Sequence, residues 1–297
     1  MKMCATQLKK AIQRCITLFM LTILACVFLF PIVLTVVNSF MSPFEITNRY
    51  SSTVTASNGF ARTGLIHFVD MTLIPSFVSF RQYMKLLIEE PLYLGLFWNS
   101  VKLTLPVVVG QILISVPGAY AFELSRFKYK EAVFFIYIVV MLLPLQVVLV
   151  PNYMVADFFN IKSSYLAIIM PGIFHPFGIF LARQFLKGTP KEYIEAAKVD
   201  GAGHIRILVL VIVPMIKTAI AALTILTFID YWNLVDQAII FIDKAINEPF
   251  SVYLSRLSET NLEIVFAASC FYMLPVVLIF LYGQESMVKG IQLSGIK

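Results

Sequence analysis

The sequence predicts an all-α polytopic membrane protein with six transmembrane helices and both termini in the cytoplasm. Of its 297 residues, 59% are hydrophobic and only 13% are charged, whereas soluble domains carry charge on roughly 25% of their residues. Apolar runs of about 20 residues, the length that crosses a bilayer, recur along the chain. Lys and Arg gather in alternate connections between these runs, which is the pattern that orients membrane proteins.

Six apolar runs satisfy the length criterion, and their approximate bounds are 15–37, 97–120, 132–151, 165–186, 214–235 and 264–284. The first run has 23 residues without a charge, too many for the h-region of a signal peptide, which has about 7–15. We therefore interpret it as a retained anchor. The chain then divides into four parts: a tail and first helix (1–38), an extracytoplasmic loop with a surface helix (39–96), a core of five helices (97–285) and a cytoplasmic tail (286–297).

Basic residues indicate which side each connection faces. The N-terminal tail has four, the second-to-third connection three, and the fourth-to-fifth connection five if Arg183 at the span edge is included. The third-to-fourth connection has only Lys162. Both termini are therefore expected in the cytoplasm. The net charge of +6 follows from this distribution and gives no support for nucleic-acid binding.

The outer connection has two parts. Residues 39–75 are rich in Ser, Thr, Asn and Gly and predict an irregular loop. The following "SFRQYMKLLIEEPLYLGLFWNS" has helical spacing and predicts a helix along the outer membrane surface. Prolines inside several spans fit either ordinary packing kinks or bent helices around a path that opens and closes.

Metal and redox chemistry have little support in the sequence. The four cysteines include no CxxC pair, and no HExxH is present. We therefore predict no disulfide framework, no metal site and no catalytic residue.

The stretch "EYIEAAKVDGAGHIRILVLVIVPM", residues 192–215, lies between the fourth and fifth spans. Thr189, Pro190 and Glu192 form a capping-box pattern that predicts a helix start, and Gly201 predicts its end. A second apolar segment then runs to Pro214, near the cytoplasmic boundary. This helix–turn–helix either merely links two spans, or presents a smooth surface to a cytoplasmic partner through its small residues.

Here the sequence resembles the EAA loop of the binding-protein-dependent ABC importer permeases. Glu195-Ala196-Ala197, three residues, Gly201, nine residues and then 211–214 follow that family's spacing. "EAAKVDGAG", "AYAFELSRFKYK" and "GIFLARQFLKGTPKEYIEAA" resemble its carbohydrate-uptake branch, and the likeness covers about 80–297. Val211 and Val213 depart conservatively from the usual ending, and Thr218 stands where the family often has Pro.

The resemblance implies a type I ABC importer permease fold in a bacterial or archaeal cytoplasmic (inner) membrane. Its expected partners are a second permease, homologous or identical, two cytoplasmic P-loop ATPases, an extracytoplasmic solute-binding protein and a sugar substrate. The expected contacts to an ATPase are Glu195, Ala196, Ala197, Asp200, Gly201 and Pro214. The chain has no GxxxxGK[ST] motif. No cofactor is therefore expected in this chain, and the partner ATPases are expected to bind ATP and Mg²⁺.

Polar residues within spans are candidates for the substrate path. His175 stands between two prolines of the fourth span, where it either bonds a kinked backbone or touches solute. Asp230, Trp232 and Asn233 cluster at the outer end of the fifth span. Carboxylates and amides bind sugar hydroxyls and Trp stacks on sugar faces, although an interfacial Trp is also an ordinary membrane anchor.

Three alternatives remain at this point. The same machinery could carry another solute, such as a glycerol-phosphate ester, because the EAA loop reports coupling and not cargo. The chain could be an intramembrane enzyme that uses His175 and the aspartates. It could also be a membrane scaffold, although a scaffold would not need six proline-kinked spans.

Overall fold

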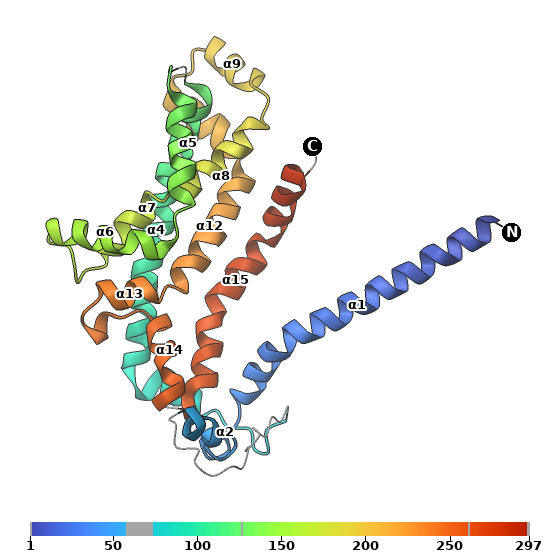
Figure 1. Ribbon diagram of the computed structural model, residues 1–297, viewed down its shortest axis with the longest axis vertical. Coiled ribbons are helices and arrows are strands. Elements are labelled where there is room, and N and C mark those ends of the chain that lie inside the picture. Colours follow the sequence, from blue (N-terminus) through green and yellow to red (C-terminus); the bar gives the residue numbers. More distant parts are fainter. Residues whose placement is uncertain (1, 58–73, 126, 261, 296–297) are drawn as a thin grey trace. The chain divides into compact units, whose positions relative to one another are not determined.

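The computed structural model describes residues 2–57, 74–125, 127–260 and 262–295, which are largely helical (Figure 1). They form two compact units. Unit 1 comprises Met1–Pro91 and Arg256–Phe271, and unit 2 comprises Leu92–Ser255 and Tyr272–Lys297. The long helix α15 (Leu262–Gly295) continues from the second part of unit 1 into the second part of unit 2.

Unit 1 is built on the long helix α1 (Lys2–Asn38). Its apolar stretch Ile12–Asn38 has a mean hydropathy of 2.8. Its apolar side chains are exposed, among them Phe19 and Phe28 at 67% and 69%. A helix of this length and composition suits a lipid environment. The other elements of unit 1 are α2 (Pro43–Ser57), α3 (Arg81–Met84), a π-helical turn (Lys85–Glu89) and parts of α14 (Phe250–Thr260) and α15.

The predicted irregular loop 39–75 is wrong over Pro43–Ser57, where the structure has helix α2. Three contacts explain why a Ser- and Thr-rich segment is helical. Arg49 and Glu45 form an i,i+4 ion pair at 2.7 Å, Ile46 is completely buried, and Tyr50 packs edge-on against Phe266. Tertiary packing thus overrides a weak local preference. The part of the loop at 58–73 lies outside the described residues.

The helix predicted before the second span is present from Arg81 to Glu89, first as α3 and then as the π-helical turn. It ends at Glu90, whose extended backbone separates it from α4.

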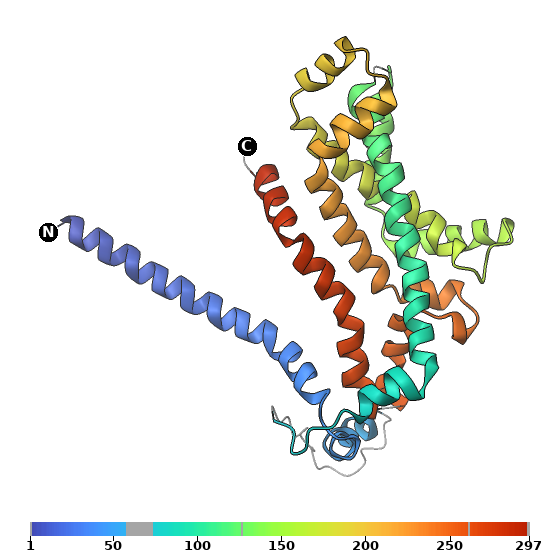
Figure 2. The ribbon, with the colours of Figure 1, turned by 180° about the vertical axis from the view of Figure 1, so that it is seen from behind.

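Unit 2 holds the remaining helices. They are α4 (Pro91–Leu124), α5 (Lys130–Met141), α6 (Leu145–Phe158), α7 (Leu166–Ile173), α8 (Pro176–Lys187), α9 (Glu192–Val199), α10 (His204–Ile207), α11 (Val213–Met215), α12 (Lys217–Trp232) and α13 (Asp236–Phe241), with parts of α14 and α15. A π-helical turn, Leu208–Ile212, joins α10 to α11. Figures 1 and 2 show the yellow segment with α9 at one end of this unit.

Among the described residues, four helical stretches are long and apolar enough to cross a membrane, or up to six if each of two bent pairs is one span. The third predicted span, 132–151, is not one straight helix: α5 and α6 meet at 102°. Pro144 explains the break, because it precedes α6 in an extended conformation (φ −65°, ψ 145°) and disfavours helical backbone at Leu143. The second bent pair joins His204–Met215 to α12 at 77°.

Helices α4 and α8 of unit 2 pack at very short range. A Cβ placed on Gly178 would lie 2.1 Å from Ser115 Oγ, so only glycine permits this approach. The surrounding core cluster includes Val116 and Ala119 of α4 and Ala182 and Leu186 of α8. Ile194, Ile207 and Ile212 of the segment 187–213 belong to the same cluster. The segment therefore packs on α4 and α8.

Candidate functional site

Helix α9 is fixed to the core by one side of its surface. Ile194, 4% exposed, packs in the same cluster as Leu186, Ile207 and Ile212. Ala197 is half-buried against that cluster. The predicted capping box is wrong, because Thr189 Oγ1 donates to the carbonyl of Phe185 at 3.2 Å instead. The helix starts at Glu192 after Lys191 without a side-chain cap, so tertiary packing of Ile194 positions it.

The predicted glycine turn at the end of α9 is confirmed. Gly201 has φ +76°, the left-handed conformation that glycine adopts without penalty. The N–H of Gly201 donates to Lys198 O and the N–H of Ala202 donates to Ala197 O, both at 3.0 Å. A Cβ on Gly201 would meet nothing within 4 Å. The requirement for glycine here is therefore conformational and not one of space.

The second segment of the loop returns the chain to α12 through a π-helical turn. The N–H of Val213 donates to the carbonyl of Leu208, five residues earlier. Pro214 follows, and a proline has no N–H and crowds the carbonyl four residues before it. A wider π turn relieves that crowding. Pro214 thus lies in α11, two residues before the break at Ile216, where the backbone bends by 77° into α12.

The remaining predicted coupling residues lie on the outside of the loop. Glu195, Ala196, Asp200 and Gly201 are all exposed. Three exposed apolar residues beside them were not predicted, namely Tyr193 (61%), Val199 (87%) and Ile205 (80%). Apolar side chains gathered on an exposed surface mark interaction sites. The helical period could have indicated Tyr193, because it is adjacent to the buried Ile194 and so points away from the core.

A buried ionic cluster lies just before the loop, at the end of α8. Arg183 is 1% exposed and pairs with Glu123 Oε2 at 3.3 Å and with Glu131 Oε1 at 2.6 Å. Its guanidinium carbon lies 3.9 Å from the ring centroid of Phe134. The hydrogen bond from Arg183 holds the pKa of Glu131 below its usual value.

The four predicted path residues lie in two different environments within unit 2. His175 precedes α8 in an extended conformation. It is exposed, and so is Asp230. Asn233 is also exposed. Trp232, by contrast, is 1% exposed, stacked between Phe228 and Tyr272. Its indole therefore offers no free face to a sugar in this structure.

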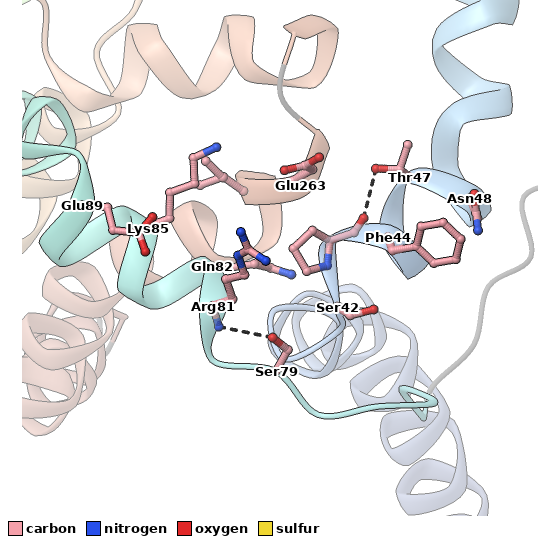
Figure 3. A pocket seen from close by; sticks show the side chains of 12 residues that line it. Ser42, Phe44, Thr47, Asn48, Ser79, Arg81, Gln82, Lys85, Glu89 and Glu263 are labelled. Carbon is pink, nitrogen blue, oxygen red and sulfur yellow. Dashed lines mark hydrogen bonds between the residues drawn. The ribbon is translucent and has the colours of Figure 1, made fainter.

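Unit 1 contains a polar cavity of about 720 Å³, shown in Figure 3. Its lining comes from the start of α2, from 79–89 and from the start of α15. Four of the lining residues are charged: Arg81, Lys85, Glu89 and Glu263. In the part of the chain that the structure describes, no group of three His, Cys, Asp or Glu side chains could hold a metal ion.

These features define a helical membrane protein with a firmly anchored, exposed helix–glycine–helix loop before its last long helices. The family described as binding-protein-dependent transport system inner membrane component matches residues 111–285, which is more than half of the chain. The chain belongs to this family. It is therefore a transport component, and this finding decides against the intramembrane-enzyme and scaffold alternatives.

The chain is similar to curated permeases over most of its length. It is 25% identical over 264 residues to an arabinooligosaccharides transport system permease protein of Halalkalibacterium halodurans, covering 87% of this chain and 92% of that one. It is 32% identical over 208 residues to an sn-glycerol-3-phosphate transport system permease protein of Yersinia enterocolitica, covering 68% and 74%.

A solved transporter structure contains a chain with the same fold. It is a chain of a bacterial ABC transporter involved in the import of the acidic polysaccharide alginate, with a TM-score of 0.73 and 23% identity over 92% of this chain and 95% of that one. A structure of a bacterial alginate ABC transporter in complex with an alginate pentasaccharide-bound periplasmic protein matches with a TM-score of 0.56 and 15% identity, over 92% and 94%.

Proposed function

We propose that this chain is the membrane permease subunit of an ATP-driven, binding-protein-dependent importer of a sugar or oligosaccharide. Family membership supports the importer, and the similarity to an arabinooligosaccharide permease along most of the chain supports the carbohydrate. In this proposal the chain has six spans and both termini in the cytoplasm of a bacterium or archaeon. Each bent helix pair is then one span.

The geometry of the loop 187–213 is the observation that carries the proposal. A transport subunit driven by a separate ATPase needs a rigid surface that the ATPase can grip and displace. The buried Ile194 and the Gly201 turn make α9 rigid. Val199 and Ile205, 87% and 80% exposed, flank that turn and suit an apolar groove on a partner. Glu195, Ala196, Ala197, Asp200 and Pro214 keep their expected role in this contact.

The partners follow from that role. Two ATPase subunits bind ATP and Mg²⁺ in the cytoplasm, a second permease completes the path, and a solute-binding protein delivers solute outside. In the proposed topology the cavity of unit 1 faces the extracytoplasmic side, where its exposed Arg81 and Glu263 offer hydrogen-bonding groups to that protein or its solute.

His175, Asp230 and Asn233 are the residues that we assign to the solute path. All three are exposed in unit 2. A carboxylate, an amide and an imidazole together offer both donors and acceptors to sugar hydroxyls. Trp232 is assigned a supporting role in place of direct sugar stacking, because its rings are covered.

A glycerol-phosphate ester is the second candidate for the solute. The sn-glycerol-3-phosphate permease of Yersinia enterocolitica is 32% identical over 68% of this chain, a higher identity over a shorter stretch. The two candidates differ in charge, and a phosphate needs cationic partners that a neutral sugar does not.

The test begins with affinity purification of the tagged protein in mild detergent, followed by mass spectrometry. A P-loop ATPase and a six-span permease should co-purify. The complex is then reconstituted with its binding protein, and solute-stimulated ATP hydrolysis is measured for a panel of sugars, oligosaccharides and glycerol phosphate. Stimulation by a saccharide supports the main proposal, and stimulation by glycerol phosphate alone supports the second. A preparation without any ATPase after crosslinking from the loop would contradict both.

A further inference from the structure

Arg183 joins three helices of unit 2 at a single buried point. It belongs to α8, while its ion-pair partners Glu123 and Glu131 belong to α4 and α5. The ring beneath its guanidinium, Phe134, is also on α5. The side chain is 1% exposed, although Glu131 on its outer side is 69% exposed.

A buried guanidinium is an energetically costly link between helices. Removing a charge from water is costly, and apolar residues of similar volume often stabilise a fold as well or better. Here Arg183 Nη1 is buried without a partner in the described structure, which adds to the cost. The planar guanidinium of an arginine instead fixes the direction of the hydrogen bond to each of its partners. Stability alone therefore does not explain this residue.

The location of the cluster suggests why Arg183 should have a fixed orientation. The loop 187–213 begins four residues after Arg183. At the far side of Gly201, His204 Nδ1 is hydrogen-bonded to the hydroxyl of Tyr120 at 3.0 Å. Tyr120 and Glu123 are three residues apart on α4, and such residues share one helix face. Both sides of the loop are thus tied to the same turn of α4.

We propose that Arg183 is a positioning residue for energy coupling, which binds the end of α8 to α4 and α5 so that a displacement of the loop moves these helices together. This proposal rests on the proposed function of the loop as the ATPase contact. Without the cluster, α9 can still bind an ATPase, but its movement is absorbed at the end of α8 and does not reach α4.

The experiment uses the whole transporter, purified with its partner ATPases and reconstituted with its binding protein. Arg183→Gln is compared with Lys128→Gln, a matched control that removes an exposed cation placed 5.6 Å from the ring centroid of Tyr129. We expect Arg183→Gln to retain its ATPases and its basal hydrolysis. The increase in hydrolysis on adding loaded binding protein should fall about tenfold, within the range of ordinary allosteric coupling. Arg183→Lys keeps the charge but lacks the planar guanidinium that bonds two partners at once. It should recover part of the stimulation of hydrolysis.

A double variant separates coupling from folding. Arg183→Met with Glu123→Gln removes both buried charges, so no carboxylate is left unpaired in the interior. We expect this variant to assemble and to remain uncoupled. Normal stimulation in either the double variant or Arg183→Gln overturns the proposal, and so does failure of both variants to assemble, since the cluster would then be purely structural.

The wild-type complex distinguishes this proposal from the one on which it rests. If wild-type protein binds no ATPase, the proposed function fails. If the wild type is stimulated normally and the Arg183 variants are as well, only the role of Arg183 fails.

Discussion

Trp232 and Tyr272 bind each other through two reciprocal hydrogen bonds. The indole Nε1 of Trp232 donates to the carbonyl of Tyr272 at 3.1 Å, and the hydroxyl of Tyr272 donates to the carbonyl of Trp232 at 2.7 Å. Phe228 stacks on the other side of the indole, with ring centroids 5.2 Å apart. The pair therefore fixes the end of α12 against α15 within unit 2.

The first prediction follows from this burial. Trp232→Ala should reduce stability by about 3–5 kcal/mol, as expected for a large aromatic removed from a packed interior. The thermal unfolding temperature of the detergent-purified protein should fall, while the apparent KM for transport in the surviving fraction stays unchanged. Trp232→Phe should lose much less stability. A Trp232→Ala variant of normal stability with a raised KM would instead place the indole in the solute path.

The path residues should respond in the opposite way, because they are exposed, although the Asn233 amide oxygen also accepts a hydrogen bond from the Tyr272 hydroxyl at 2.9 Å. His175→Ala and Asn233→Ala are expected to leave the unfolding temperature within a few degrees of the wild type and to raise the apparent KM several-fold. Uptake measured in proteoliposomes gives the apparent KM of each variant. Unchanged kinetics in both variants would remove these residues from the path.

Substitutions at Gly201 test the turn. Gly201→Val should strain the left-handed backbone by more than the about 1–2 kcal/mol that an unbranched residue costs there, because Val is β-branched. Gly201→Asn should be tolerated better, since Asn adopts this conformation several-fold more often than most residues. Transport and the ratio of sugar moved to ATP hydrolysed should fall in the order Gly, Asn, Val. Equal coupling in all three would mean that the conformation of this turn is unimportant.

Ile194 and Val199 provide a matched pair on α9, one buried and one exposed. Ile194→Ala should cost about 2–5 kcal/mol by opening a cavity beneath the helix. Hydrogen exchange of α9 should therefore accelerate. Val199→Ala should leave exchange unchanged and weaken co-purification of the ATPase. If exchange accelerates equally in both, Val199 is part of the core of the loop and not of its contact surface.

The Glu131–Arg183 contact predicts a pH dependence. The folded protein lowers the pKa of Glu131 below its usual value of 4.5, chiefly through the hydrogen bond from Arg183. A lowered carboxyl pKa stabilises the folded state above the unfolded pKa, and the contribution is lost as pH falls through the folded pKa. The stability difference between wild type and Glu131→Gln should thus be constant above about pH 4.5. It should shrink as pH falls from there through the folded pKa, and a difference that does not shrink at all on acidification would contradict the assignment.

The sequence predicts the apolar helices of this fold well, because a run such as 15–37 or 264–284 needs no tertiary context to reveal itself. The bend after Met141 was within reach of prediction, since Pro144 breaks the helix by local chemistry alone. Helix α2 was not, because its polar composition argues for a loop and only the contacts of Ile46 and Tyr50 make it helical.

The candidate site likewise has residues whose roles the sequence predicts and residues whose roles it does not. Gly201 could be predicted, since a left-handed turn after a helix has a local signature. The role of Arg183 could not, because Glu123 and Glu131 lie 60 and 52 residues away in the chain. In the sequence it resembles an ordinary orienting charge at a span edge. The burial of Trp232 could not be predicted for the same reason, since Tyr272, which covers it, lies 40 residues further on.

The open space around Gly201 makes its requirement one of handedness and not of size. A side chain of the ordinary configuration is disfavoured there although nothing obstructs it, because the backbone has φ +76°. The mirror-image configuration prefers this conformation. A D-alanine at this position, introduced by semisynthesis, should therefore fit the turn as well as glycine does, and should stabilise the folded state because it restricts the unfolded chain.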